Sequence, residues 1–127
     1  MTVSVLDTSA VLAWLHDEPG NDVVEPLLPQ AIMSTVNWSE TAQKIAQHGA
    51  DPDRTLGRLQ ALGVHVEPFT TVDALAAAAL WPTTRVGALS LGDRACLALA
   101  RRLNLPAVTA DRAWRKLDVE LRIQLIR

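Results

Sequence analysis

Short apolar runs alternate along the chain with longer segments of helical periodicity. Five runs are short and β-branched or alternating, which is typical of strands: residues 2–6, 31–36, 64–69, 107–109 and 119–126. The segments between them predict helices over residues 10–16, 22–27, 37–48, 52–62, 71–81 and 91–103. Strands separated by helices form right-handed βαβ units. The pattern therefore predicts an α/β fold, with a mostly parallel sheet between helical layers.

Capping residues support several of these boundaries. Asp51 followed by Pro52 is a common opening of a helix, and Gly63 is a common end. Ser90 is placed to cap the helix over residues 91–103, and Pro82 stops the alanine-rich helix before it. No repeat, linker or low-complexity tract interrupts the series, which favours a single domain over residues 1–127.

The composition fits a domain of this kind. Of 127 residues, 49% are hydrophobic, which is enough for one core without disulfide bridges. The single cysteine, Cys96, favours a reducing compartment and a buried thiol. The amino terminus lacks the pattern of a signal peptide, and no apolar run is long enough to span a membrane. We therefore expect a soluble cytoplasmic protein.

Charge is unevenly distributed along the chain. The net charge is −2, which by itself says little about partners. Residues 1–40 contain six acidic residues and no lysine or arginine, whereas residues 94–127 contain eight basic residues and three acidic ones. Such a basic segment either follows a phosphate backbone or forms the solvated faces of helices. Charge alone favours the second interpretation.

Four acidic residues occur where strands end or helices begin. Asp7 directly follows the first predicted strand, and Asp111 follows the fourth. Glu40 lies near the start of the helix after the second strand, and Asp93 lies in the first turn after Ser90. Ligands of open parallel sheets bind beyond the carboxyl ends of the strands. We therefore expect all four carboxylates at one edge of the sheet.

Each acid taken alone has an ordinary explanation, because carboxylates are common in turns and in first helical turns. Four carboxylates at one rim, however, repel one another unless a cation lies among them. Oxygen ligands without His or Cys favour Mg²⁺ or Mn²⁺, which suit the hydrolysis of a phosphodiester. The hydroxyls of Ser9, Ser90 and Thr109 are placed to orient water or the carboxylates, although helix capping alone explains Ser90.

The blocks around these acids resemble those of PIN-domain proteins, above all VapC-type toxins of prokaryotic toxin–antitoxin pairs. They are Leu6-Asp7-Thr8-Ser9-Ala10-Val11, Ser39-Glu40, Leu89-Ser90-Leu91-Gly92-Asp93 and Thr109-Ala110-Asp111-Arg112-Ala113-Trp114. The resemblance covers the whole chain in order and spacing. It implies a PIN-like three-layer fold and a Mg²⁺-dependent endoribonuclease, with Mn²⁺ as a possible substitute. Its catalytic metal ligands would be Asp7, Glu40, Asp93 and Asp111.

The resemblance also implies partners and a substrate. A VapC-type toxin forms a homodimer, binds a VapB-like antitoxin, and cuts structured RNA such as tRNA or rRNA, which inhibits translation. Arg94, Arg112 and Arg115 are candidate contacts to RNA phosphate, with Arg112 the best placed, or else they solvate helix faces. Of the tryptophans, we expect core positions, with Trp114 the best candidate for stacking on a base. The apolar helix at residues 10–15 is either core or a partner contact.

Two other functions compete with this interpretation. An aspartate-nucleophile phosphatase needs a second aspartate two residues after the first, but position 9 is Ser9. It also needs a lysine near the site, and the chain has only Lys44 and Lys116. The second alternative is a PIN-like module that binds RNA or protein without catalysis. The complete acid set argues against that module, and the sequence leaves it open.

Overall fold

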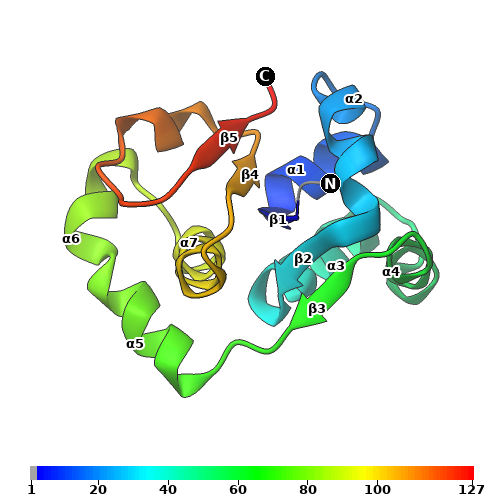
Figure 1. The fold of residues 1–127 in the computed structure, drawn as a ribbon. Helices are drawn as coiled ribbons and strands as arrows, with labels where there is room; N and C mark the ends of the chain where they lie inside the picture. Colours follow the sequence, from blue (N-terminus) through cyan, green and yellow to red (C-terminus); the bar gives the residue numbers. More distant parts are fainter. Residues whose placement is uncertain (1–2) are drawn as a thin grey trace.

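The computed structural model describes residues 3–127, in which five strands form one sheet. The strands are β1 (Ser4–Leu6), β2 (Ala31–Ser34), β3 (His65–Glu67), β4 (Ala107–Thr109) and β5 (Ile123–Leu125). Their order across the sheet is β3-β2-β1-β4-β5, and every neighbouring pair is parallel. Figure 1 shows this sheet between helices on its two sides. The predicted α/β fold with a parallel sheet is confirmed.

Helices fill the segments between the strands. The α-helices are α1 (Thr8–Leu15), α2 (Asn21–Val24), α3 (Thr35–Gln47), α4 (Pro52–Ala61), α5 (Thr71–Ala79), α6 (Trp81–Thr84) and α7 (Leu91–Leu103). Three 3₁₀ helices are η1 (Glu25–Gln30), η2 (Arg85–Gly87) and η3 (Arg112–Lys116). Every predicted helix has an observed counterpart, and the boundaries predicted for α7 agree with the structure.

Differences from the predicted boundaries have local causes. The helix predicted over residues 22–27 becomes α2 followed by η1, because Pro26 and Pro29 interrupt the α-helical hydrogen bonding. The second strand ends at Ser34, since its Oγ accepts from the N–H of Val36 and begins α3 earlier than predicted. The first strand was predicted to begin at Thr2, which lies outside the described residues.

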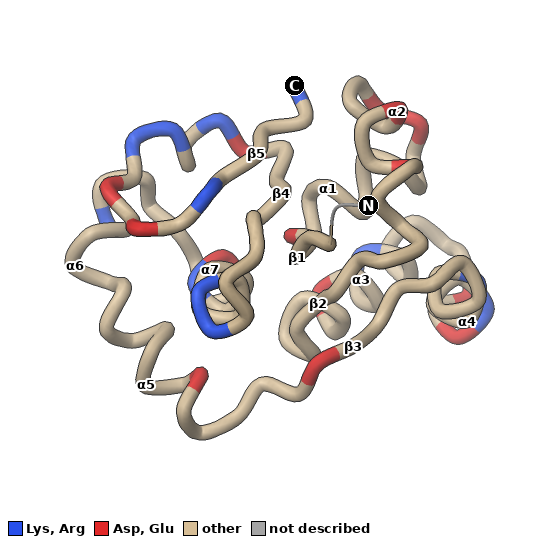
Figure 2. Tube along the Cα trace, in the orientation of Figure 1, with Lys and Arg blue, Asp and Glu red and all other residues tan. Residues whose placement is uncertain are grey.

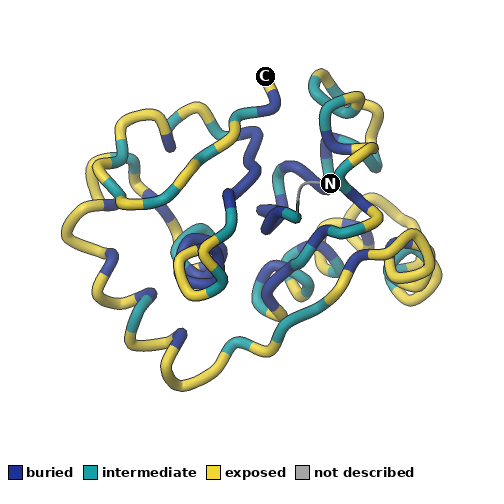
Figure 3. The backbone as a smooth tube through the Cα atoms, in the orientation of Figure 1, coloured by how far each residue is buried: buried dark blue, intermediate teal, exposed yellow. Residues whose placement is uncertain are grey.

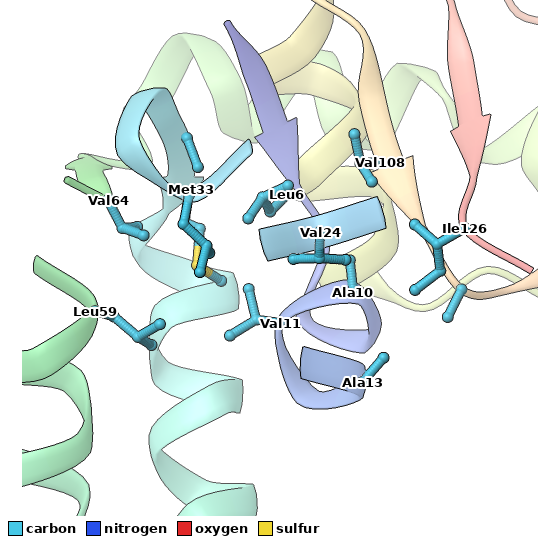
Figure 4. Packing of buried hydrophobic residues seen from close by; sticks show 13 residues of the cluster. Leu6, Ala10, Val11, Ala13, Val24, Met33, Leu59, Val64, Val108 and Ile126 are labelled. Carbon is cyan, nitrogen blue, oxygen red and sulfur yellow. The ribbon is translucent and has the colours of Figure 1, made fainter. Parts of the chain in front are cut away.

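Two hydrophobic clusters pack against the two faces of the sheet. Leu6 and Val108 belong to the cluster that contains side chains of α1, α2 and α4, several of which appear in Figure 4. Their strand neighbours Val5 and Ala107 belong to the cluster that contains side chains of α5 and α7. Successive residues of a strand point to opposite faces, so the helical layers lie on opposite sides. Figure 3 shows α7 largely buried and α5 largely exposed; Cys96 of α7 is buried, as predicted.

The order of the strands creates a switch point between β1 and β4. From β1 the chain adds β2 and then β3 on one side, and later returns through α7 to add β4 and β5 on the other. In the β1–β4 pair, Val5 lies opposite Ala107 and Leu6 opposite Val108. The carboxyl ends of both strands therefore open side by side, at the type of crevice where parallel α/β sheets bind ligands.

In the part of the chain that the structure describes, no helix has the length and apolar character needed to cross a membrane.

Candidate active site

Asp7 lies at the switch point of the sheet. It directly follows β1 and is the N-cap residue of α1, with only 3% of its surface exposed. Its N–H donates to the carbonyl of Val108 at 2.9 Å, which fixes it at the junction of β1 and β4. The sheet itself therefore sets the position of this carboxylate.

Two hydroxyl groups hold the Asp7 carboxylate. Ser9 Oγ donates to Asp7 Oδ2 at 2.7 Å, and Thr109 Oγ1 donates to the same oxygen at 3.0 Å. Ser9 Oγ also accepts from the N–H of Ala110 at 2.9 Å, and Thr109 Oγ1 accepts from the N–H of Asp111 at 3.1 Å. One network of hydrogen bonds thus connects the start of α1 with the end of β4.

Burial makes the Asp7 carboxyl group hard to ionise. Removal from water is the largest effect and raises its pKa to about 7, although the hydrogen bond from Ser9 opposes the rise. The negative charge of Asp93 raises the pKa further, Thr109 lowers it, and Glu40 adds a smaller increase. Near neutral pH the group is therefore divided between its protonated and charged forms. A cation nearby would favour the charged form.

Glu40 reaches the same region from α3. Its Oε1 accepts a hydrogen bond from Thr8 Oγ1 at 2.8 Å and another from Asn37 Nδ2 at 2.9 Å. Thr8 is the residue after Asp7, so the first bond ties α3 directly to the first turn of α1. Glu40 is half-buried, and its second carboxylate oxygen accepts no hydrogen bond from the described residues.

Asp93 is fixed by a capping box at the start of α7. Ser90 Oγ accepts from the N–H of Asp93 at 3.2 Å, and Asp93 Oδ2 accepts from the N–H of Ser90 at 2.9 Å. Burial raises the pKa of Asp93, the Ser90 bonds oppose the rise, and the charges of Asp111 and Glu40 add to it. Ser90 is thus the cap of the helix as well as a direct partner of this carboxylate.

Asp111 is the fourth acid of the site and lies two residues after the end of β4. It is the N-cap residue of η3, and its Oδ1 accepts from the N–H of Ala113 at 2.9 Å. Its own N–H is held by Thr109, the same residue that contacts Asp7. Thr109 is therefore the direct link between the acids that follow the two central strands.

The four acids act on one another electrostatically from four different elements. Asp7 is influenced by Asp93 and Glu40, and Asp93 by Glu40 and Asp111. Within residues 3–127, however, no three His, Cys, Asp or Glu side chains are gathered closely enough to hold one metal ion. The fold brings the acids to one rim, while hydrogen bonds within the fold occupy one oxygen on each carboxylate.

The three arginines expected to contact phosphate have different surroundings. Arg94 is half-buried, and its Nη1 donates to the carbonyl of Ala77 at 3.0 Å, so it joins α7 to α5. This internal bond disfavours the predicted phosphate contact at Arg94. Arg112 and Arg115 are exposed on η3, where Arg112 Nε contacts the carbonyl of Arg127 at 3.4 Å. Phosphate contact stays a prediction for this exposed pair.

Trp114 occupies a core position, as expected for the tryptophans, so its ring is not available to stack on a base. Trp114 is only 1% exposed and packs in the hydrophobic cluster with α5 and α7, as expected of a core anchor. Trp81 is the exposed tryptophan, at 51%, and the Arg85 guanidinium lies 5.3 Å from the centroid of its ring. The core position expected for Trp81 was therefore wrong, and this exposed ring lies on α6 and not on η3.

The structure tests the core role expected for helix α1, while its role as a partner contact stays a prediction. Ala10, Val11 and Ala13 are buried in the core, which confirms the core interpretation for one face. Trp14 and Leu15 are half-buried against the same core, and with Thr55 and Arg58 of α4 they line a cavity of about 230 Å³. A second cavity of about 200 Å³ adjoins Leu15 and includes none of the four acids. The outer end of α1 therefore offers apolar surface away from the candidate site.

Three residues of the site escaped the sequence analysis. Thr8 and Asn37 donate to Glu40, and Gly92 packs against the Glu40 carboxylate. Asn37 and Glu40 are three positions apart, a spacing that brings side chains together on one helix face. An asparagine within a helix is also unfavourable by propensity, which is a second signal of a specific contact.

Solved structures with a similar fold come mainly from toxin–antitoxin complexes. A chain of a toxin–antitoxin complex from Klebsiella pneumoniae is 19% identical, with a TM-score of 0.72 over 87% of this chain and 89% of that chain. DNA-bound VapBC from Salmonella typhimurium gives 17% identity and a TM-score of 0.72 over 100% of both chains. FitAcB from Neisseria gonorrhoeae is 19% identical, with a TM-score of 0.70 over 98% of both chains. These similarities show the shared fold.

A search of curated protein sequences finds no match. The sequence profile of the PIN domain, in contrast, matches residues 4–120, which include all four acids and most of the sheet. With the α/β architecture and the acids at the switch point, this match identifies the chain: it belongs to the PIN-domain family.

Proposed function

We propose that the protein is a VapC-type toxin, a metal-dependent endoribonuclease whose active site contains Asp7, Glu40, Asp93 and Asp111. The observation that carries the proposal is the electrostatic coupling of these acids around the carboxyl ends of β1 and β4. A buried carboxyl group with a pKa near 7 beside other acids is typical of a functional site and destabilises a fold that has no use for it. Membership in the PIN-domain family, whose members are generally nucleases, supports the same activity.

The donor set fits a hard divalent cation. The four side chains offer carboxylate oxygens only, which suits Mg²⁺ or Mn²⁺ better than a softer metal. A cation at this rim would offset the burial and the mutual repulsion that raise the pKa values of Asp7 and Asp93. When bound, the metal supplies Lewis-acid stabilisation of the phosphodiester and a water of lowered pKa for hydrolysis.

The surrounding residues keep the acids in place for this chemistry. Ser9 and Thr109 donate to Asp7 Oδ2 and so favour the charged form of a buried carboxyl group. Thr8 holds Glu40 from the first turn of α1. The N–H of Ser90 holds Asp93. These contacts fix the direction of each carboxylate before a ligand arrives.

RNA is the proposed substrate, and its phosphates have basic residues within reach. Figure 2 shows basic residues on η3, the turn that begins at Asp111 and follows β4. Arg112 and Arg115 of this turn are exposed. A phosphate backbone bound there would pass close to Asp111 and would be held in a salt-dependent manner.

We further propose a homodimer and a VapB-like antitoxin as partners. The proteins of similar fold are described as VapBC, FitAB or toxin–antitoxin complexes. The apolar surface of Trp14 and Leu15 on α1 is a candidate contact for the antitoxin. Exposed Val72, Leu75 and Trp81 on α5 and α6 are candidate contacts for a second copy.

The decisive test is cleavage of total cellular RNA by protein purified free of any partner. Reactions contain Mg²⁺, Mn²⁺ or EDTA, and an Asp7→Asn variant purified in the same way is the control. Discrete cleavage that needs the metal and is absent with Asp7→Asn is the expected result, and mapping its ends identifies the substrate. Cleavage that persists with Asp7→Asn points to contamination. A folded protein that neither cleaves RNA nor binds metal supports the non-catalytic PIN-like module instead.

A further inference from the structure

The two oxygens of the Glu40 carboxylate have different surroundings. Oε1 accepts two hydrogen bonds, from Thr8 Oγ1 at 2.8 Å and from Asn37 Nδ2 at 2.9 Å. Among the described residues, none donates to Oε2. One oxygen is therefore held by two hydrogen bonds, whereas the hydrogen-bonding capacity of the other is not used by the described residues.

Asn37 is built into the fold in a way that fixes this arrangement. Its side chain is fully buried, and Nδ2 bridges Glu40 Oε1 and the carbonyl of Gly92, the latter at 3.0 Å. The backbone carbonyl of Asn37 accepts a hydrogen bond from Thr41 Oγ1 at 2.7 Å. The side-chain amide of Asn37 therefore connects Glu40 on α3 with the first turn of α7. Its contact there, Gly92, is the residue before Asp93.

The other half of the Asn37 amide is unsatisfied. Oδ1 is buried and has no hydrogen-bond partner within residues 3–127. A buried acceptor without a partner is destabilising, so an asparagine here is unfavourable for stability alone. Its donor group, in contrast, is fully used on Glu40 and Gly92. The two hydrogen bonds that Asn37 donates therefore explain why an asparagine occupies this position.

The Glu40 carboxylate also packs against Gly92. A Cβ atom added at this glycine would overlap the Glu40 carboxylate, including both of its oxygens. The glycine lies inside α7, in a conformation open to any residue, so the reason for it here is space and not backbone freedom. The carboxylate therefore lies directly against the first turn of the helix that carries Asp93.

We propose that Asn37, with Gly92 behind it, is a positioning residue for the metal site: it holds Oε1 of Glu40 and thereby presents Oε2 to the cation. This inference rests on the proposed function, because it gives Glu40 its role as a metal ligand. The competing explanation is that Asn37 only joins α3 to α7. The two explanations differ in whether the effect of Asn37 passes through Glu40.

A double-mutant cycle separates them. Mn²⁺ affinity is measured for wild type, Asn37→Ala, Glu40→Ala and the double variant, from the rise of Tm with Mn²⁺ concentration, which works for weak binders as well. We expect Asn37→Ala to weaken Mn²⁺ binding about tenfold, as loss of a group that orients a ligand commonly does. In the Glu40→Ala background the same substitution should change the affinity little, because the residue it positions is gone.

Thr41→Val is the matched control. Thr41 is also fully buried on α3 and donates one hydrogen bond, but to the backbone of Asn37 and not to Glu40. The Thr41→Val substitution should lower Tm without changing Mn²⁺ affinity. Equal Mn²⁺ affinity of Asn37→Ala and wild type, or an equal loss in both backgrounds of the cycle, overturns the positioning role.

The same proteins are tested for RNA cleavage in parallel. Wild type that binds Mn²⁺ but cuts no RNA contradicts the proposed function, while the cycle still decides the role of Asn37. Wild type that does not bind Mn²⁺ at millimolar concentrations overturns the metal site and this inference together.

Discussion

The hydroxyl groups of Ser9 and Thr109 converge on a single oxygen of Asp7. They approach Oδ2 to 2.7 Å and 3.0 Å and lie 3.1 Å from each other, although the two residues are 100 positions apart in the chain. Both hydrogen bonds oppose the increase in pKa that burial imposes on the carboxyl group. The ionisation of Asp7 near neutral pH therefore depends on this pair.

Removing one of these hydroxyls should produce a defect that depends on pH. Without the hydrogen bond from Ser9, the pKa of Asp7 rises further, and a proton competes more strongly with a metal ion. Ser9→Ala should weaken Mn²⁺ binding about tenfold at pH 7, since a hydrogen bond to a charged group contributes about 1.5–3 kcal/mol. The defect should shrink by pH 9, where protons no longer compete. Calorimetric titration across this range measures it, and a defect equal at both pH values contradicts the explanation.

Asp7 itself should make the metal-free protein less stable as the pH rises. Its pKa of about 7 in the folded protein exceeds the ordinary value, so folding favours the protonated form. The associated stability is present below about pH 4 and is lost as the pH rises through about 7. Asp7→Asn should therefore be more stable than wild type at pH 8, by on the order of 2 kcal/mol, and nearly equal at pH 4. Urea unfolding in EDTA tests this, and a difference that does not vary with pH refutes it.

Gly92→Ala should separate stability from activity. Gly92 is the second residue of α7 and has an ordinary helical backbone, which alanine adopts more readily than glycine, so the substitution ought to be harmless to α7. Its Cβ, however, would displace the Glu40 carboxylate, which can rotate away because it is the end of a flexible side chain. We expect a folded protein with unchanged or slightly altered Tm, weaker Mn²⁺ binding and little RNA cleavage. Gly57→Ala in α4, where an added Cβ meets nothing within 4 Å, is the control.

The ion pair of Arg102 with Asp73 should matter for stability alone. Arg102 Nε and Nη2 donate to the two oxygens of Asp73 at 2.8 Å and 3.2 Å, which joins α7 to the start of α5. Asp73 is 2% exposed, and although burial raises its pKa, the bonds from Arg102 and Thr70 lower it more. Arg102→Ala should reduce the free energy of unfolding by about 2 kcal/mol. Mn²⁺ affinity should stay unchanged, and a loss there would tie this pair to the site.

More of the fold than of the candidate site could be predicted from the sequence. The alternation of short apolar runs with helical segments was enough for the five strands and the parallel sheet, because each strand and helix carries its own periodicity. The caps at Ser90 and Asp51 act within a few residues, so those helix starts were also predictable. Where prolines compete with helical periodicity, as at Pro26 and Pro29, the outcome depends on packing.

The rest of the site was less predictable because it depends on contacts between distant segments. The position of Asp7 follows from its strand, but its bond with Thr109 spans 102 positions and exists only once β1 and β4 are paired. The contact between Gly92 and Glu40 likewise requires the packing of α7 on α3. The exposure of Trp81 had no local signal, since a tryptophan in a chain with one phenylalanine and no tyrosine is expected in the core.

The pairing of β1 with β4 also has a consequence for synthesis of the protein. The ribosome releases the segment with Asp7 first, whereas Thr109 and Asp111 emerge about a hundred residues later. Until β4 enters the sheet beside β1, the Asp7 carboxylate has neither its Thr109 partner nor the acid that follows β4. An unfinished chain, or one truncated before residue 107, therefore lacks the assembled acid rim. If this rim cuts RNA, the growing chain is harmless to the ribosome until β4 has been made and has paired with β1.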